Sequence, residues 1–113
     1  MSYEPDAGDL IWTDFDPSTG REQSGSRPAL VISPVPFYRA SGFAIVCPIT
    51  SRVRPFPTSV VLPAGLPIIG EILTSHVRSI DALARGIAFS GARVPSATLA
   101  EVRGKLAALA GLI

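Results

Sequence analysis

Several residue types on which protein chemistry often depends are scarce in this sequence. The 113 residues include one Cys and one His, and only one of the ten basic side chains is a Lys. A single cysteine cannot form an intramolecular disulfide, which favours a reducing, cytoplasmic setting. A structural zinc site needs about four nitrogen or sulfur ligands, so one Cys and one His argue against it. We therefore expect no metal and no other cofactor.

Long hydrophobic runs are also missing. No apolar stretch approaches the roughly 18 residues that a membrane-spanning helix needs. The first apolar cluster, Leu10 to Trp12, is far too short for the hydrophobic region of a signal peptide. With 47% hydrophobic and 17% charged residues, the chain can bury enough apolar surface to exclude disorder. The length predicts one domain covering residues 1–113 and no membrane association.

Acidic side chains are nearly absent from most of the chain. Residues 1–16 hold five of the nine Asp and Glu, which leaves four among residues 17–113, where all ten basic residues lie. Nine of those ten are Arg, whose planar guanidinium suits phosphate better than the Lys ammonium does. A GC-rich genome would also replace Lys by Arg throughout a sequence. The positions of the arginines must therefore decide between the two explanations.

Short apolar runs separated by Pro, Gly and polar residues predict five or six strands. The expected strands cover Asp9–Phe15, Pro28–Ser33, Phe43–Ile49, Ser59–Leu62, Glu71–Val77 and Ile87–Ser90. A short helical turn is expected at Pro36–Ala40, and Arg78–Asp81 is expected to begin a turn. Cys47 lies inside an apolar run, which indicates a packed, inert thiol.

One helix is expected at the C-terminal end, opening near Pro95. Leu99, Val102, Leu106 and Leu109 follow spacings of three, four and three, which places them on one helical face. Short strands followed by one helix predict a mainly β protein, a small curved antiparallel sheet or barrel closed by that helix.

The polar residues concentrate where two strands begin or end. Arg27 directly precedes a buried strand, and Thr50 follows another. Two polar loops, 16–26 and 51–57, flank these positions, and the second carries Arg52, Arg54 and Phe56. Cations for phosphates, an aromatic ring for stacking and adaptable loops suit single-stranded nucleic acid. Alternatively, the two arginines form a solvated loop and Phe56 tucks beneath it.

RNA cleavage is a chemistry that such a site can perform, because the 2′-hydroxyl of RNA is itself the nucleophile. The protein must stabilise the charge of the phosphorane and help to move protons. Arg27 fits the first task, and Thr50 can hydrogen-bond the phosphate or the attacking hydroxyl. Glu22 and His76 are the nearby side chains whose ordinary pKa values suit proton transfer. The alternatives are a surface Arg27, a turn-forming Thr50 and a structural His76.

These residues stand in a sequence that resembles the MazF/PemK toxin family over about residues 8–112. The similarity begins with Gly8-Asp9-Leu10-Ile11-Trp12-Thr13-Asp14-Phe15-Asp16-Pro17, and continues with Gly20, Glu22-Gln23, Gly25 and Arg27-Pro28-Ala29-Leu30-Val31-Ile32-Ser33-Pro34. It extends through Cys47-Pro48-Ile49-Thr50, Phe56-Pro57, Val77-Arg78-Ser79-Ile80-Asp81 and Ala84-Arg85-Gly86. The Gly-Asp…Asp-Phe-Asp-Pro and Arg-Pro-Ala-Leu-Val segments are highly specific.

The resemblance implies an SH3-like barrel with a C-terminal helix, of the CcdB/PemK-like toxin fold. It implies a sequence-specific, metal-independent endoribonuclease that cuts single-stranded RNA and leaves 2′,3′-cyclic phosphate and 5′-hydroxyl ends. It also implies a homodimer and a MazE-like antitoxin partner, whose disordered acidic tail we expect to bind the basic loops. The catalytic positions it assigns are Arg27, Thr50 and Glu22. The RNA-binding residues expected on this basis are Gln23, Ser24, Arg52, Arg54, Phe56, His76 and Arg78.

One segment departs from the family pattern. The PemK-like branch uses an Arg and an Asp catalytically just before the Val-Arg-Ser-Ile-Asp motif, where this chain has Leu73 and Ser75. His76 replaces a Gln that often stands there. The alternative of another class is a CcdB-like toxin, which poisons DNA gyrase through a C-terminal Trp-Gly-Ile. This chain instead ends Gly111-Leu112-Ile113, and its only Trp is Trp12.

Overall fold

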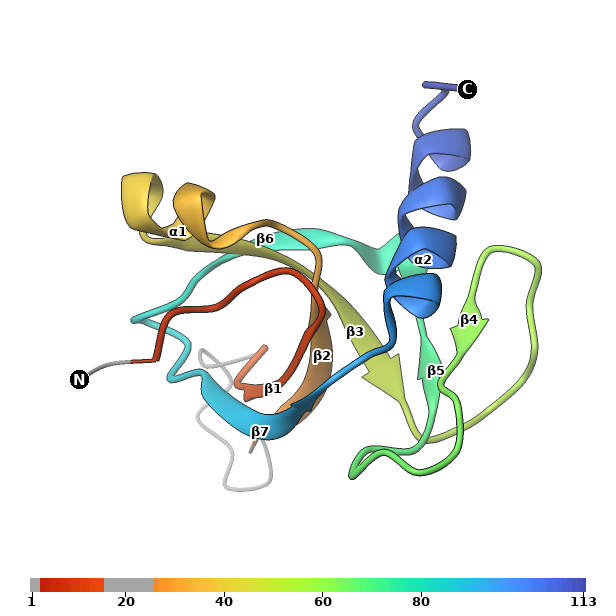
Figure 1. Cartoon of the computed structure of the whole chain (residues 1–113), viewed down its shortest axis with the longest axis horizontal. Helices are drawn as coiled ribbons and strands as arrows, with labels where there is room; N and C mark the ends of the chain where they lie inside the picture. The colour runs from red at the N-terminus through yellow and green to blue at the C-terminus, as the bar shows by residue number, and fades with distance from the viewer. Residues whose placement is uncertain (1–2, 16–25) are drawn as a thin grey trace.

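The computed structural model describes residues 3–15 and 26–113, which form a strongly curved antiparallel sheet with one long helix beside it (Figure 1). The elements are β1 (Asp9–Thr13), β2 (Arg27–Val31), α1 (Val35–Ser41), β3 (Phe43–Thr50), β4 (Val60–Val61), β5 (Glu71–Ile72), the 3₁₀ turn η3 (Thr74–His76), β6 (Arg78–Asp81), β7 (Ala88–Arg93) and α2 (Ser96–Leu109). The predicted mainly β architecture with a C-terminal helix is confirmed.

β3 is the central strand of the sheet. The strand order is β4-β5-β3-β2-β1-β7, and β6 also pairs with β3. The first half of β3 pairs with β6 and its last two residues pair with β5, while β2 lies along its other edge. The sheet therefore changes partners along the eight residues of β3, and this allows it to curl.

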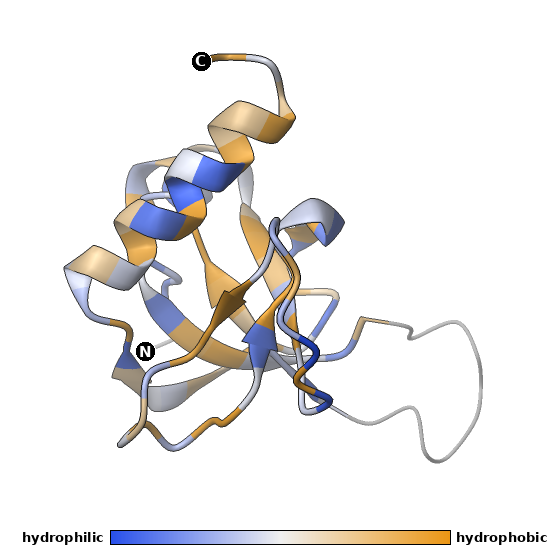
Figure 2. Cartoon of the chain, turned by 90° about the vertical axis from the view of Figure 1, so that its right-hand side faces the viewer, coloured by the Kyte–Doolittle hydropathy of each residue, from blue (hydrophilic) through white to orange (hydrophobic). Residues whose placement is uncertain are grey.

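Two separate hydrophobic clusters lie on the opposite faces of the central strands. Leu10, Leu30 and Cys47 belong to the cluster that packs against α2, whereas their neighbours Ile11 and Val46 belong to the other. Successive residues of a strand point to opposite faces, so strands buried on both faces contain continuous apolar runs. The strands are accordingly mostly hydrophobic in Figure 2, whereas α2 alternates between polar and apolar bands.

The predicted apolar face of the C-terminal helix is largely confirmed. Val102 is completely buried in the first cluster, and Leu99 and Leu106 pack against that cluster. Leu109 is 46% exposed, because the helix extends beyond the edge of the sheet (Figure 1). Cys47 is completely buried, which confirms that its thiol is packed, and this burial raises the pKa of the thiol to about 12.

Two local predictions were wrong. The strand expected at Glu71–Val77 ends at Ile72: the Leu73 amide still donates to the Pro48 carbonyl of β3 at 2.8 Å, but the chain then turns through η3. The turn expected from Arg78 to Asp81 is strand β6, which pairs with β3 over four residues. Pairing with a strand more than thirty residues away in sequence stabilises β6, and no local pattern shows such a partner.

Other boundaries shift by one or a few residues. α1 is longer than the single turn predicted, and it ends at Gly42, whose φ of 79° is a left-handed conformation that favours glycine. β7 begins one residue later than expected and runs on to Arg93. Within the described residues, no helix is long and apolar enough to cross a membrane.

Candidate active site

The start of β2 and the end of β3 bring Arg27 and Thr50 to the same edge of the sheet. β2 and β3 are antiparallel, with Ala29 opposite Pro48. Continuing this pairing by two residues, toward the start of β2 and the end of β3, places Arg27 opposite Thr50. Residues two apart in a strand share a face. Both side chains line one cleft of about 310 Å³, so the structure unites the two residues predicted to be catalytic.

The walls of this cleft are mostly apolar. Trp12 contributes a ring that is 38% exposed, and the side chain of Ile69 is 82% exposed. The remaining lining residues are Pro28, Ile49, Ser51, Pro67 and Ile68. Sequence reasoning did not assign a role to Trp12 or Ile69. Trp12 is the one exposed position of β1, and the pairing of β1 with β2 places it opposite Pro28, so that it lines the same cleft as Arg27.

A second cleft, of about 370 Å³, meets the first at Thr50. It contains four of the predicted RNA-binding residues. These are Arg52, Arg54, Phe56 and His76. Ser59, Glu71, Leu73 and Ser75 complete its lining. The two clefts together form a surface that carries three arginines, one histidine and two exposed aromatic rings.

The structure decides between alternatives at Phe56 and His76. Phe56 is 64% exposed, so it is not tucked under its own loop. His76 is exposed at the end of η3, and its backbone amide donates to the Leu73 carbonyl at 3.0 Å. A histidine satisfied inside the core, the structural alternative, is therefore wrong for His76. Both side chains are available to a ligand in the second cleft.

Gly70 lets the chain pass directly beneath Thr50. Its φ is 153°, and a Cβ atom built there would overlap the carbonyl oxygen of Thr50 and lie 3.0 Å from Cγ2 of Ile49. The Thr50 carbonyl oxygen is a backbone atom, and it cannot move without displacing the end of β3. Glycine at this position therefore permits the observed placement of Thr50, and sequence reasoning missed it.

The other predicted site residues lie elsewhere. Arg78 is exposed on β6, with its guanidinium 5.3 Å from the centre of the Phe15 ring, and it lines neither cleft. This distance fits a cation–π contact. Glu22, Gln23 and Ser24 lie outside the described residues. Their predicted roles stay predictions.

Glu71 is a functional candidate that the sequence pattern did not reveal. Its side chain is 2% exposed and borders the second cleft, where the carboxylate contacts the backbone of loop 51–57. A charged residue at a buried position of a predicted strand was the available signal. As for metal ligands, no group of three His, Cys, Asp or Glu side chains in residues 3–15 and 26–113 could hold an ion.

Residues 6–110 match the family described as PemK-like, MazF-like toxin of type II toxin–antitoxin system. This chain belongs to that family. It is 40% identical to the endoribonuclease toxin MazF of Escherichia coli K12 over 109 residues, which are 96% of each chain. It is accordingly a MazF-like endoribonuclease toxin, and the gyrase-poison alternative is not the family that matched.

Solved structures of relatives show the same MazF-like fold. MazF of Deinococcus radiodurans (Form-I) matches with a TM-score of 0.87 at 46% identity, over 97% of this chain and 99% of that one. The MazE–MazF structure of the same organism (Form-II) also matches with a TM-score of 0.87, at 42% identity, over 99% and 100% of the two chains. In that structure the relative is paired with its MazE.

Proposed function

We propose that this toxin cuts single-stranded RNA in the cytoplasm, at specific sequences, through attack of the 2′-hydroxyl on the adjacent phosphate. The products are a 2′,3′-cyclic phosphate and a 5′-hydroxyl. The observation that carries the proposal is the shared cleft of Arg27 and Thr50. Family membership supports the reaction class, and the geometry supports the assignment of these two residues.

Arg27 is the electrostatic residue of this mechanism. Its guanidinium stays positively charged and offers two parallel N–H groups to the phosphate oxygens, which gain charge in the phosphorane. The cleft around it has mostly apolar walls, which include Trp12 and Ile69, and RNA that fills the cleft would exclude water there and strengthen the interaction. Arg27 is a stabiliser rather than a proton donor, because a guanidinium does not deprotonate in proteins.

Thr50 orients the reacting groups. Its Oγ1 accepts a hydrogen bond from the Arg52 amide at 3.2 Å, which leaves its own O–H free to donate to a phosphate oxygen. An unperturbed threonine is not a general base. Glu22 and His76 are the two candidates for proton transfer, and Glu22 is the one that matches the position of the family's first-loop glutamate.

The second cleft supplies the grip on RNA. Arg52, Arg54 and His76 offer donors to phosphates, and Phe56 offers a ring for base stacking. Trp12 extends the stacking surface to the base beside the scissile phosphate. Gln23, Ser24 and Arg78 are the remaining proposed RNA contacts, and of these three the structure describes Arg78, which lies against Phe15.

A cleavage assay on a long RNA tests this proposal. Purified protein is expected to cut RNA in excess EDTA, because the 2′-hydroxyl rather than a metal-bound water is the nucleophile. An all-DNA analogue of a cleaved sequence should stay intact, since it lacks that hydroxyl. Activity that disappears in EDTA and returns with Mg²⁺ would contradict the mechanism.

We also propose that the toxin is a homodimer restrained by a MazE-like antitoxin. Leu109, Leu112 and Ile113 are 46%, 76% and 87% exposed, and together they give an apolar surface that a second copy could cover. Two copies would join two arginine-bearing loops into one longer groove. An acidic, disordered antitoxin tail would bind the same arginines and compete with RNA. Light scattering that gives the mass of one chain, with full activity, would refute the dimer.

A further inference from the structure

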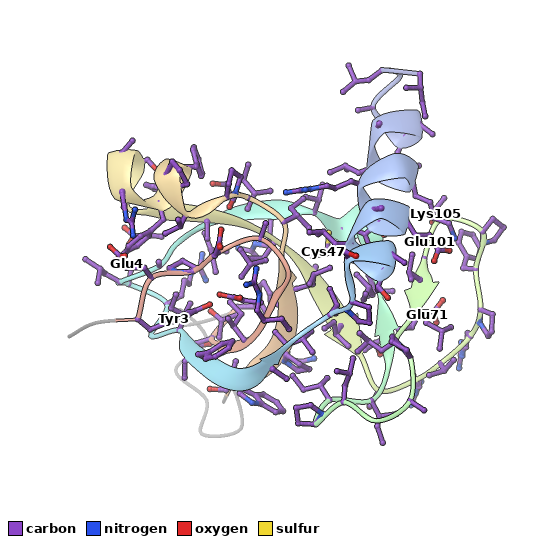
Figure 3. All side chains as sticks on the ribbon, in the orientation of Figure 1. Tyr3, Glu4, Cys47, Glu71, Glu101 and Lys105 are labelled. Atoms are coloured by element: carbon purple, nitrogen blue, oxygen red, sulfur yellow. The ribbon has the colours of Figure 1, made fainter. Side chains whose placement is uncertain are left out.

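Loop 51–57 is attached to the sheet through a buried carboxylate. Glu71 lies on β5, opposite Thr50 of β3, and points toward the loop (Figure 3). Its Oε1 accepts a hydrogen bond from the Arg54 amide at 2.8 Å, and its Oε2 accepts one from the Phe56 amide at 3.1 Å. Both carboxylate oxygens therefore bind backbone donors of the same short loop.

Burial of the Glu71 carboxylate costs free energy that its hydrogen bonds must offset. A buried charge is costly unless polar partners replace water. In the described part of the chain, no Lys or Arg nitrogen lies within ion-pair distance of the Glu71 carboxylate, and the carboxylate accepts its hydrogen bonds from the two loop amides. Those amides have no strand or helix ladder of their own. The carboxylate and the loop backbone thus satisfy each other, and neither keeps its partners if the loop moves away.

Further contacts continue the attachment toward the helix. The Ser59 amide donates to the Phe56 carbonyl at 2.9 Å, and Lys105 Nζ of α2 donates to the Ser59 carbonyl at 2.7 Å. Figure 3 shows Glu71 on β5 below Glu101 and Lys105 on α2. The segment from Arg54 to Ser59 is consequently held from both sides, although the side chains of Arg54 and Phe56 are exposed.

We propose that Glu71 is a positioning residue that fixes the backbone of loop 51–57 and so presents Arg52, Arg54 and Phe56 to RNA. This inference rests on the proposed function of the second cleft. An ordered loop binds without losing conformational freedom, whereas a loose loop must be ordered by each substrate molecule. Glu71 therefore acts on RNA binding through the loop, and touches neither the substrate nor the reacting atoms.

Glu71→Gln is the primary test, because it preserves the shape of the side chain. A carboxylate has two acceptor oxygens, whereas the Gln amide has one and would place an NH₂ group against a backbone N–H. We expect the KM for a cleaved RNA to rise roughly 10-fold or more, with kcat nearly unchanged. In the same variant, hydrogen exchange of the Arg54 and Phe56 amides should accelerate by about 10-fold or more.

Glu101→Gln is the matched control. Glu101 borders a cleft on the other side of the same loop and forms an ion pair with Lys105 at 3.6 Å, but contacts no loop amide. The Glu101→Gln substitution removes the same charge as Glu71→Gln from the same side of the protein. Its KM and the exchange of the two loop amides should stay at wild-type values. Equal effects in both variants would mean that net charge, rather than loop position, governs RNA binding.

Three further outcomes overturn the inference. The first is a folded Glu71→Gln protein whose KM and loop-amide exchange are those of the wild type. The second is a fall in kcat with KM unchanged, which would place Glu71 in the chemistry. If Glu71→Gln does not fold, Glu71→Asp is the deciding variant, because it keeps the charge but moves the carboxylate away from the loop amides by the length of one methylene. The third outcome is a Glu71→Asp protein whose loop-amide exchange and KM are those of the wild type.

The exchange measurement separates this inference from the proposed function. A wild-type protein that cuts no RNA would refute the proposed function. Faster exchange at Arg54 and Phe56 in Glu71→Gln would still support the loop attachment in that case. Cleavage by the wild type together with unchanged exchange in the variant would refute the attachment alone.

Discussion

Replacement of Arg27 by Ala separates catalysis from folding in this protein. Arg27 is exposed at the start of β2, and within the described residues its side chain makes no hydrogen bond or ion pair. Its backbone pairs with Thr13 of β1, and that pairing does not depend on the side chain. Surface substitutions away from such contacts usually change stability by no more than about 0.5 kcal/mol. The free energy of unfolding should therefore stay close to that of the wild type.

The expected loss of activity is much larger. Removal of one preorganised donor from a developing oxyanion costs about 3–4 kcal/mol of transition-state stabilisation, or about 10²–10³ in rate. Arg27→Lys should restore only part of the rate, because an ammonium keeps the charge but lacks the two parallel N–H groups.

Single-turnover cleavage of a defined RNA in EDTA, together with urea unfolding, measures both quantities. Arg39→Ala is the matched control, since Arg39 is an exposed arginine on α1 that pairs with Glu4 at 2.9 Å and lines neither of the two clefts. We expect that control to cleave at nearly the wild-type rate. A folded Arg27→Ala protein with near wild-type cleavage would refute the catalytic role and leave Arg27 as a surface residue.

Three further predictions concern other parts of the molecule. Gly70→Ala should lower both the cleavage rate and the melting temperature, because its Cβ would displace the carbonyl of Thr50 and crowd Ile49; unchanged kinetics would show that Thr50 tolerates the shift. Asp6 has a pKa below its ordinary value of 3.8, chiefly through the amide of Val35, so its contribution to stability is present above about pH 3.8 and is lost as the pH falls through the lower folded value. The stability difference between wild type and Asp6→Asn should accordingly be present at pH 7 and shrink in strong acid, and a difference independent of pH would contradict this. RNA affinity should fall steeply with salt, since arginines that bind phosphates release counterions; a flat salt dependence would argue against the proposed loop contacts.

The amino-acid sequence by itself determined much of the fold. The apolar runs around Leu30 and Val46 predicted two of the central strands, and the structure buries successive residues of these runs in the two clusters on opposite faces. The spacing of Leu99, Val102 and Leu106 predicted the face of α2 that packs on the sheet. These predictions succeed because periodicity is a local property, set by the geometry of one strand or one helix.

The sequence also located Arg27 and Thr50, one at the beginning of a strand and one at the end of another. Antiparallel pairing of those strands is enough to bring such positions to one edge. The same local reasoning failed from Glu71 to Asp81, where β6 takes the place of a turn. The partner of β6 is the first half of β3, and no pattern within β6 specifies it.

Only the tertiary structure decided what surrounds the two central residues. Trp12 shares a cleft with Arg27 because β1 pairs with β2, and Gly70 lies against Thr50 because the adjoining strand β5 pairs with the end of β3. Glu71 reaches amides 15 and 17 residues away in sequence, a contact that depends on where a loop closes over a strand. Local sequence fixes the conformation of each segment, but contacts between distant segments depend on register and loop closure, which are properties of the whole folded chain.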